Sequence, residues 1–400
     1  MNTVCILGLG YVGLPVALGI SQKFVTIGFD ISRKRISELK RKHDSNNEFK
    51  LLDFKNKKIT FTNDKLYLKK GNFFIICVPT PVNKNNLPDL TYIKNSMSII
   101  SKILKSGDII VLESTVYPGV TEKFTSYLEK KTKLINNKDF FMCYSPERVN
   151  PGDNSKKLKN IKKIFAVKTN KKNIIRRIKN VYNLISKKII FSNGIKEAET
   201  AKAIENTQRD LNIALFNEIL ILSKKMNLNF NEIIRLASSK WNFIKFKPGL
   251  VGGHCLPVDP YYLSYVASKS NFKTKTLLAG RDTNNYMMEF VQYQIIQQIK
   301  IRNLNSKSKI LLVGMSYKYG VSDLRNSLNI KIYEKIKKKF INTSVYDPFV
   351  RIEKNLKYKD LKRSFDLIVF LSSGKKFKDL YNKYKNTKNT FILDPFDYYS

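Results

Sequence analysis

The sequence predicts an α/β protein in three parts: an N-terminal doubly wound parallel sheet, a central domain built on a long helix, and a smaller C-terminal α/β domain. Three observations support this. Apolar runs alternate with helix-like stretches in the first half of the chain, one amphipathic stretch of about thirty residues follows, and a second alternating series comes last. We expect domains at residues 1–193, 194–303 and 304–400.

The first domain is predicted from strand-like runs that alternate with amphipathic stretches. The strand candidates are TVCILGLG, VTIGFD, FFIICVP, DIIVLEST, FFMCYSP, IFAV and KIIF. The helical candidates between them are Leu14–Lys23, Tyr92–Leu104, Thr121–Lys131 and Lys172–Ser186. Alternation of this kind is typical of a doubly wound parallel sheet.

The central domain is predicted from helical periodicity without strands. Ile195–Met226 reads as one helix of ~45 Å. A shorter helix is expected at Asn231–Ser238, then a Gly/Pro-containing loop, then a helix at Thr276–Ile301. A long helix of this kind commonly bridges domains or forms a dimer interface. The C-terminal strands are KILLVGMS, TSVYD, DLIVFLS and TFILDP.

Composition narrows the class of protein. A chain of 400 residues is too long for one core, and it has no apolar run of ~18 residues and no basic segment before Val4–Leu9. We therefore expect a soluble cytoplasmic protein without membrane association. Cys5, Cys77 and Cys143 lie in apolar runs and should be buried. With two histidines in the sequence, we expect no histidine-built metal site.

The net charge of +41, from 73 basic and 32 acidic residues, raises the alternative of a nucleic-acid-binding protein. The lysines are scattered over nearly every segment, however, and no helix-turn-helix, RNP-like or zinc-finger pattern occurs. We expect no nucleic-acid partner. The charge should still attract anionic ligands.

A glycine motif predicts a dinucleotide site. Gly8, Gly10 and Gly13, with Leu9, Tyr11 and Val12 between them, follow a strand and open a helix, and the next strand ends at Asp30. The glycines allow a tight turn, approach of a pyrophosphate and close helix–strand packing, and the helix N-terminus favours anions. Asp30 is placed to accept hydrogen bonds from ribose hydroxyls, which favours NAD⁺ in a Rossmann-like domain. The nearby basic residues Arg33, Lys34 and Arg35 are, in contrast, of the kind that binds the 2′-phosphate of NADP⁺.

The segment from Pro248 to Pro260 contains the one cysteine outside an apolar run. Glycines before Cys255 would let substrate atoms reach the thiol, prolines stiffen the loop, and Asp259 supplies a carboxylate. The alternative is a structural turn with an incidental thiol. On the long helix, Lys202 and Asn206 share one face, which is ordinarily solvated. Near a thiol, the same pair would favour the thiolate and stabilise an oxyanion.

Seven motifs along the chain resemble those of the UDP-glucose/GDP-mannose 6-dehydrogenases. They are GLGYVGLPVA, VPTP, ESTVYPG, SPERVNPG, ETAKAIENT, GLVGGHCLPVDPYYL and SYKYGVSDLRNS. KWNFIKFKPGLVGGHC and VDPYYL resemble most closely the bacterial UDP-N-acetylhexosamine 6-dehydrogenases of capsule and O-antigen pathways. The resemblance implies NAD as cofactor, UDP-N-acetylglucosamine or UDP-N-acetylgalactosamine as substrate, a uronate for surface polysaccharides as product, and a homodimer formed by the long helix.

The resemblance also implies roles for individual residues. Cys255 would form a thiohemiacetal and then a thioester with C6, Lys202 and Asn206 would stabilise oxyanions, Asp259 would organise a water, and Glu147 and Thr115 would position the hydrolytic water. The substrate would contact Glu147, Arg148, Lys202, Asn206, Gly252 and, through its UDP, Lys318. The cofactor would contact the glycine motif with Tyr11 and Val12, and also Asp30, Arg35, Pro79, Thr80, Ser114, Thr115 and Arg325.

Three departures from the family pattern are visible. A second acid that follows Glu147 in some branches is absent, Leu256-Pro257 is an uncommon pair after the cysteine, and Arg325 is followed by Asn326-Ser327-Leu328, which leaves Ser327 as an expected N-cap. Two functional alternatives also stay open. A two-electron hydroxyacid dehydrogenase would need no cysteine and would make one NADH. UDP-glucose or UDP-N-acetylmannosamine could replace the expected sugar.

Overall fold

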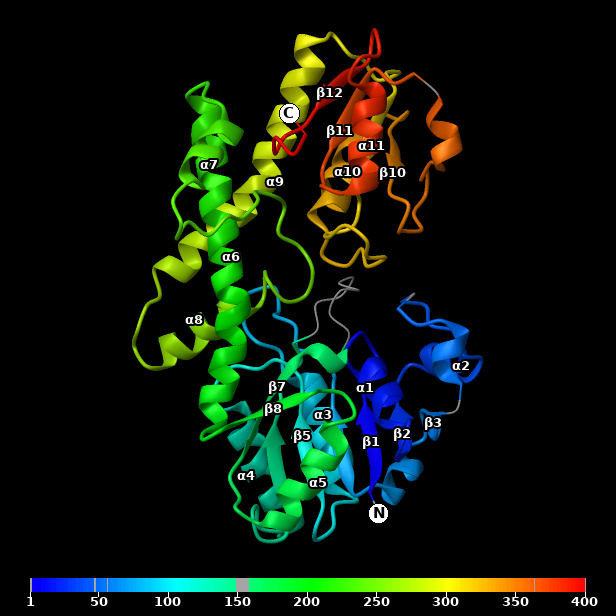
Figure 1. Ribbon diagram of the computed structural model, residues 1–400, viewed down its shortest axis with the longest axis vertical. Helices are drawn as coiled ribbons and strands as arrows, with labels where there is room; N and C mark the ends of the chain where they lie inside the picture. Colours follow the sequence, from blue (N-terminus) through cyan, green and yellow to red (C-terminus); the bar gives the residue numbers. More distant parts are fainter. Residues whose placement is uncertain (1, 47, 56, 149–157, 363, 400) are drawn as a thin grey trace. The chain divides into compact units, whose positions relative to one another are not determined.

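The computed structural model describes residues 2–46, 48–55, 57–148, 158–362 and 364–399 (Figure 1). The chain forms two compact units. The first unit contains Met1–Glu205 and Tyr261–Phe272, and the second contains Asn206–Pro260 and Lys273–Ser400. The helix α6 (Ile195–Lys225) begins in the first unit and ends in the second. The three-domain division remains a prediction.

The first unit is built on an eight-stranded sheet with the order β3-β2-β1-β4-β5-β6-β7-β8. Its strands are β1 (Thr3–Leu7), β2 (Val25–Phe29), β3 (Ile59–Thr62), β4 (Phe73–Ile76), β5 (Ile109–Leu112), β6 (Phe141–Tyr144), β7 (Lys162–Val167) and β8 (Lys188–Ser192). The paired strands are parallel except β6 and β7, which run antiparallel. The predicted parallel, doubly wound sheet is confirmed, and the antiparallel β6–β7 pair is a feature that the sequence did not predict.

Helices pack around this sheet. They are α1 (Gly13–Ile20), α2 (Arg33–Lys40), α3 (Thr91–Ser101), α4 (Val120–Thr132), α5 (Lys172–Tyr182) and most of α8 (Asp259–Lys269). The strands β1, β4 and β5 are buried along their length, which agrees with near-continuous apolar runs between two helical layers. The sequence patterns did not predict α2, β3 or α8. The helix α2 has few apolar residues, but Ser32 caps it by accepting a hydrogen bond from the Arg35 amide.

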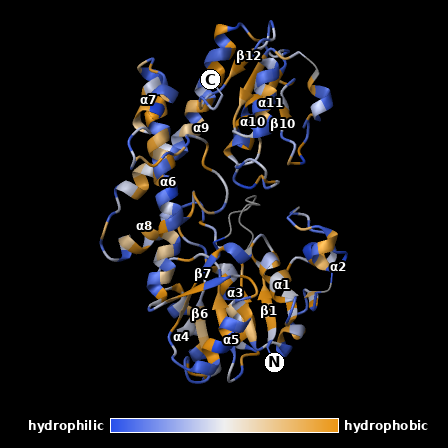
Figure 2. Cartoon of the chain, viewed as in Figure 1, coloured by the Kyte–Doolittle hydropathy of each residue, from blue (hydrophilic) through white to orange (hydrophobic). Residues whose placement is uncertain are grey.

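The second unit contains the rest of α6, α7 (Phe230–Ala237), α9 (Thr276–Ile301) and a four-stranded parallel sheet with the order β10-β9-β11-β12. Its strands are β9 (Ile310–Val313), β10 (Ser344–Tyr346), β11 (Leu367–Phe370) and β12 (Phe391–Leu393), and its further helices are α10 (Leu328–Lys339) and α11 (Lys375–Tyr384). The strands of both sheets are the hydrophobic segments of each unit (Figure 2). The predicted α/β class, long helix and smaller C-terminal sheet are confirmed.

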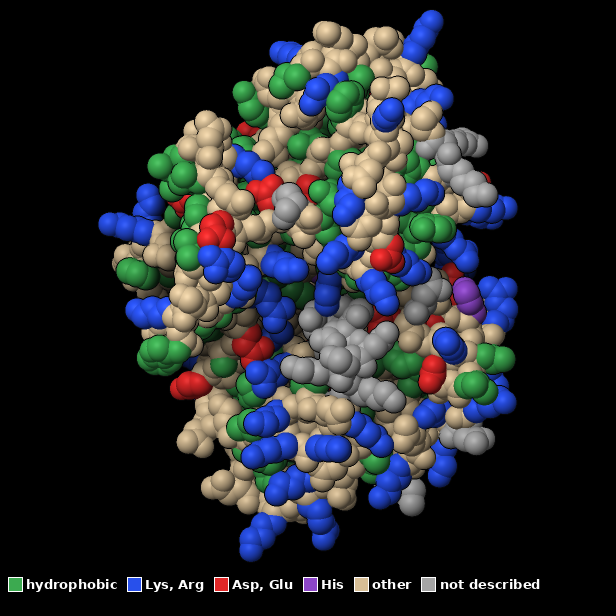
Figure 3. Space-filling view, turned by 45° about the horizontal axis from the view of Figure 1, so that its top comes forward, with side chains coloured by type: hydrophobic (Ala, Val, Ile, Leu, Met, Phe, Trp, Pro, Cys, Tyr) green, Lys and Arg blue, Asp and Glu red, His purple; other side chains and the backbone are tan. Residues whose placement is uncertain are grey.

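Two surface properties also bear on function. Among the described residues, no helix combines the length and apolar character that a membrane crossing requires. The basic side chains are distributed over the visible face and do not gather in one patch (Figure 3). This distribution agrees with the scatter of lysines along the sequence.

Candidate active site

The strand order of the first unit reverses at β1. The chain leaves β1 toward β2 and β3 on one side and returns to β4 on the other, so the loops after β1 and β4 diverge. In open α/β sheets, ligands bind at this position, outside the carboxyl ends of the strands. The glycine motif follows β1 directly, and Pro79 and Thr80 follow β4.

The three motif glycines are required for different reasons. Gly8 has a φ of +91° and lies where a Cβ atom would be 2.8 Å from the Cys77 carbonyl oxygen. A Cβ at Gly13 would be 1.8 Å from the Gly8 carbonyl oxygen, so this position holds α1 against the turn. A Cβ at Gly10 would meet no atom of the described residues within 4 Å. Gly10 therefore borders open space, as a backbone that a pyrophosphate approaches must.

Asp30 is fixed at the edge of this turn. Its carboxylate accepts hydrogen bonds from the amides of Leu9 (2.8 Å) and Ser32 (2.9 Å). Arg35 donates to the Leu9 carbonyl at 3.0 Å and pairs with Asp44 at 2.8 Å. Because the guanidinium is neutralised by Asp44, it is less suited to a 2′-phosphate, which supports NAD⁺ rather than NADP⁺.

The other predicted cofactor residues of the first unit form one connected layer. The Thr80 hydroxyl donates to the Thr115 carbonyl at 2.6 Å, and the Ser114 hydroxyl donates to the Val78 carbonyl at 2.7 Å. The Tyr262 hydroxyl, from α8, donates to the Thr80 carbonyl. These bonds join the loop after β4 to the loop after β5, so Pro79, Thr80, Ser114 and Thr115 lie together.

A pocket next to Asp30 was not predicted from the sequence. It has a volume of about 510 Å³ and is lined by the apolar side chains of Ile31, Leu66 and Ile99, with lysines at its rim. Ile31 is 71% exposed and Leu66 is 63% exposed, so both present apolar surface to solvent. Its apolar lining, next to Asp30, is of the kind that contacts a planar base such as adenine.

Glu147 belongs to a buried network of charged side chains that was not predicted from the sequence. Lys163, on β7, donates to Glu147 at 2.9 Å and to Glu113 at 2.7 Å. The Tyr182 hydroxyl donates to the other oxygen of Glu113 at 2.8 Å. Burial raises the pKa of Glu113 to about 7, and the neighbouring Glu147 raises it as well, while Lys163 lowers it. The signal in the sequence was strand alternation, which puts Lys163 on the same face as the buried Phe165.

Two further contacts connect α6 to the loops of the first unit. Arg148 pairs with Glu205 at 2.6 Å. The Glu199 carboxylate accepts hydrogen bonds from the amides of Gly119 (2.6 Å) and Thr121 (2.8 Å), at the N-terminus of α4. The loop that contains Thr115 is thereby tied to the helix that contains Lys202.

Lys202 and Asn206 are both buried, at 7% and 8% exposure. The alternative of an ordinary solvated helix face therefore does not hold for this pair. Lys202 belongs to the first unit, and it forms no ion pair with any residue that the structure describes. Asn206 opens the second unit and donates to Asp259 at 2.6 Å.

Cys255 lies in a rigid loop of the second unit. Its thiol is exposed, whereas Cys5, Cys77 and Cys143 are buried, as predicted. Its carbonyl accepts hydrogen bonds from Val258 (3.0 Å) and from Asp259 (2.9 Å). Both bonds fix the turn that leads into α8.

The same loop packs on the loop after β9. A Cβ at Gly252 would be 2.7 Å from the Asn326 carbonyl oxygen, and one at Gly253 would be 3.0 Å from the Tyr317 ring. The Asn326 side chain donates to the Gly253 carbonyl at 3.3 Å. The glycines beside the cysteine are thus needed for close packing on the 316–327 motif.

That motif holds Lys318 and Arg325. Arg325 forms two hydrogen bonds with Asp323, at 2.9 and 2.8 Å, and the His254 imidazole is 3.7 Å from Asp323. Ser327 is the N-cap residue of α10, as expected, but its hydroxyl makes no capping hydrogen bond, because it donates to the Met315 carbonyl at 2.6 Å.

The predicted site residues therefore form two groups. The first unit holds the glycine motif with Tyr11 and Val12, and also Asp30, Arg35, Pro79, Thr80, Ser114, Thr115, Glu147, Arg148 and Lys202. The second unit holds Asn206, Gly252, Cys255, Asp259, Lys318 and Arg325. Val149–Gly152 of the SPERVNPG motif lie outside the described residues. Among the described residues, no group of three or more His, Cys, Asp and Glu side chains could hold a metal ion.

These features define a dinucleotide-dependent oxidoreductase: a glycine turn at the sheet reversal, a buried carboxylate network in the same unit, and an exposed cysteine. Residues 2–186, 196–286 and 311–400 match the NAD binding, central and UDP binding domains of the UDP-glucose/GDP-mannose dehydrogenase family. The chain belongs to this family, and its cofactor is NAD.

Similar proteins agree along most of the chain. Protein CapL of Staphylococcus aureus is 41% identical over 357 residues, which cover 88% of this chain and 83% of the relative. A UDP-N-acetyl-D-glucosamine 6-dehydrogenase of Pseudomonas aeruginosa is also 41% identical, with 88% and 83% covered. A solved UDP-D-ManNAc dehydrogenase of Pyrococcus horikoshii superposes with a TM-score of 0.87 at 31% identity, covering 99% of this chain and 95% of that one.

Proposed function

We propose that the protein oxidises the C6 hydroxyl of a UDP-N-acetylhexosamine to a carboxylate, in a four-electron reaction that uses Cys255 as a covalent nucleophile. The observation that carries the proposal is the environment of this thiol. The thiol is exposed, and its loop packs against the 316–327 motif of the UDP binding domain. Shortly after it in the chain comes the buried Asp259, which accepts a hydrogen bond from Asn206. The other cysteines are buried and have raised pKa values.

We assign each proposed step to named residues. Bound NAD supplies the hydride acceptor for both oxidations. The Cys255 thiolate adds to the C6 aldehyde, and Lys202 and Asn206 stabilise the oxyanion of the resulting thiohemiacetal. After the second hydride leaves C6, water attacks the thioester carbon, the C–S bond breaks, and Glu147 takes the proton of the water. Thr115 positions this water, and Asp259 organises a proton-relay water.

Cofactor and substrate contacts follow from the same division. We assign the pyrophosphate to Gly10 and the N-terminus of α1, beside Tyr11 and Val12. The ribose is assigned to Asp30 and Arg35. The adenine is assigned to the pocket of Ile31, Leu66 and Ile99. Pro79, Thr80 and Ser114 would line the nicotinamide side, with Arg325 contributing from the second unit. Arg148 and Gly252 would contact the sugar, and Lys318 the UDP. A basic chain attracts both anionic ligands.

The sugar is the finer part of the proposal. We propose UDP-N-acetylglucosamine or UDP-N-acetylgalactosamine, with a uronate for surface polysaccharides as product, because the Pseudomonas relative at 41% identity acts on the former. The Pyrococcus protein at 31% identity acts on the mannosamine isomer. Initial rates of NADH formation with these three sugars and UDP-glucose would rank them. A higher rate on UDP-N-acetylmannosamine or on UDP-glucose than on both proposed sugars would refute this choice.

Counting NADH tests the chemistry. The wild-type protein should form two NADH per sugar, and Cys255→Ala should form no acid, because no thioester can form without the thiol. Cys5→Ala, which removes a buried thiol, is the matched control and should keep the ratio of two. A wild-type ratio of one would instead indicate a two-electron hydroxyacid-type dehydrogenase. No NADH with any sugar, together with duplex binding at physiological salt, would favour a nucleic-acid-binding protein.

We also propose a homodimer formed by α6 in the cytoplasm, where nucleotide sugars are made. Leu215 and Leu222 lie on α6, Met226 directly follows it, and each is more than half exposed in the single chain. Apolar side chains repeated along one helix are typical of a helix–helix interface. Light scattering should give twice the chain mass for the wild type and the chain mass for Leu215→Glu/Leu222→Glu. A wild-type monomer would refute the proposal.

A further inference from the structure

The network under Glu147 contains two carboxylates and one ammonium group, all buried. Lys163 is 1% exposed, Glu113 is 1% exposed and Glu147 is 7% exposed. A buried lysine is costly unless paired, and here a single ammonium bridges two carboxylates at 2.7 and 2.9 Å. The ammonium also donates to the Pro146 carbonyl at 3.2 Å, directly before Glu147.

The geometry holds Glu147 from two sides. One carboxylate oxygen accepts from Lys163, and the other accepts from the Arg148 amide at 2.6 Å. Glu113 is held separately, because its second oxygen accepts from Tyr182, whose ring packs edge-on against Phe165 at 4.9 Å. The carboxylate of Glu113 therefore serves as the fixed counter-ion of Lys163.

We infer that Lys163 is a positioning residue that keeps Glu147 ionised and oriented, and that Glu113 opposes it by adding a like charge. This inference rests on the proposed function, in which Glu147 takes the proton of the hydrolytic water. The effect of the two carboxylates on Lys163 agrees with this inference. Burial alone would lower the pKa of Lys163, but Glu113 and Glu147 raise it above its ordinary value, so the lysine stays charged.

The titratable groups recorded around this network come from five elements. They are Lys163 on β7, Tyr182 on α5, Glu113 after β5, Cys77 after β4 and Cys143 on β6, and Arg148 follows Glu147 in sequence. Burial raises the pKa of Cys77, Cys143 and Tyr182, so all three stay neutral at physiological pH. Lys163 and Glu113 are thus the charged groups of this network that act on Glu147.

A pair of charge-removing variants tests the inference through opposite effects. Lys163→Met leaves two facing carboxylates, so Glu147 should hold its proton to higher pH, and the acidic limb of the kcat–pH profile should move up by about one pH unit or more. Glu113→Gln removes a like charge and should move this limb to lower pH. The double variant should lie between the two single variants.

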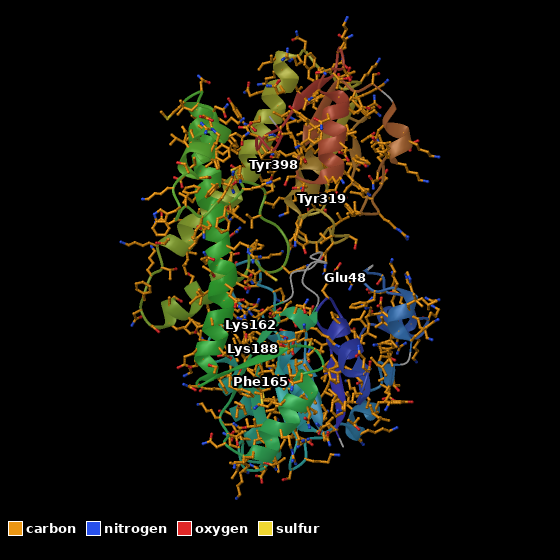
Figure 4. The ribbon with its side chains drawn as sticks, in the orientation of Figure 1. Glu48, Lys162, Phe165, Lys188, Tyr319 and Tyr398 are labelled. Atoms are coloured by element: carbon orange, nitrogen blue, oxygen red, sulfur yellow. The ribbon has the colours of Figure 1, made fainter. Side chains whose placement is uncertain are left out.

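Lys162→Met is the matched control. Lys162 is the preceding residue on β7, is exposed, and is in register with Lys188 on β8 (Figure 4). Its variant should keep the wild-type profile. Lys163→Arg, which retains the charge, should restore most of the wild-type profile.

The accumulated enzyme species gives a second readout. Mass spectrometry of acid-quenched enzyme should show a larger acylated fraction for Lys163→Met than for the wild type, because thioester hydrolysis is slowed while NADH formation in the first turnover persists. Shifts of the acidic limb in the same direction, or no shift in Lys163→Met or Glu113→Gln, would overturn the inference. A wild type that makes no NADH from any UDP-sugar would overturn the proposed function itself.

Discussion

Removing the Glu199 carboxylate should destabilise the first unit and weaken cofactor binding together. This side chain is fully buried and accepts three hydrogen bonds, from the Gly119 amide, the Thr121 amide and the Thr121 hydroxyl. Glu199→Ala would leave two buried backbone N–H groups unpaired, at about 1–3 kcal/mol each. Burial raises the pKa of Glu199 despite these bonds, so part of the loss is offset by removing a desolvated charge.

The expected net loss is about 2–4 kcal/mol, which corresponds to about 4–15 °C in Tm for a unit of roughly 200 residues. Glu199→Gln keeps one acceptor and should lose about half as much. Because the affected loop contains Thr115, KM for NAD⁺ should rise in the same order while the affinity for UDP stays unchanged. The assays are thermal unfolding by circular dichroism and steady-state kinetics.

Glu197→Gln is the control for this series, since Glu197 lies on the same helix with an exposed side chain. If Glu199→Ala unfolded within about 1 °C of that control, the three bonds would contribute nothing measurable, and the reasoning would fail. A fall in Tm without a change in KM would separate the fold from the site and refute the second half of the prediction.

Three further predictions follow from the same geometry. Gly10→Ala should keep the free energy of unfolding within about 0.5 kcal/mol of the wild-type value but weaken NAD⁺ binding at least about tenfold by calorimetry. Gly13→Ala should lower the free energy of unfolding by about 3 kcal/mol or more, because its Cβ would lie 1.8 Å from backbone. For Glu113 the folded pKa is about 7 against an ordinary 4.5, so its contribution to stability should fall as pH rises between these values, and urea unfolding of Glu113→Gln should lack that slope. Lys202→Met should raise Tm and lower kcat about 100-fold or more; an unchanged kcat would contradict it.

The fold was predictable because its signals are local. The runs around Ile75, Ile110 and Leu311 are fully buried strands, and the helix predicted at Thr276–Ile301 has these bounds in the structure. The antiparallel β6–β7 pair was not predictable in this way, because strand direction depends on the path of the connection and not on the residues in the strand.

Candidate site residues could be predicted from the sequence only where a local motif indicates a chemical role. The glycine motif and Cys255 were found from their neighbours in sequence. Lys163 and Glu113 were missed because they are fifty positions apart in the chain and meet only in the folded sheet. Local capping rules placed Ser327 correctly at the N-cap of α10, but they could not predict that its hydroxyl bonds to Met315 and not to the helix.

The long helix shows why the ordinary interpretation of polar helical positions fails here. Glu199, Lys202, Asn206 and Asp210 recur at intervals of three to four residues and are all buried. Three of them have buried partners, namely Thr121, Asp259 and Arg281. Lys202 is the member of this stripe whose ammonium forms no ion pair with a described residue. Under the proposed function this buried ammonium is left for the oxyanion that forms on the substrate, and the satisfied polar groups around it on α6 hold it in place.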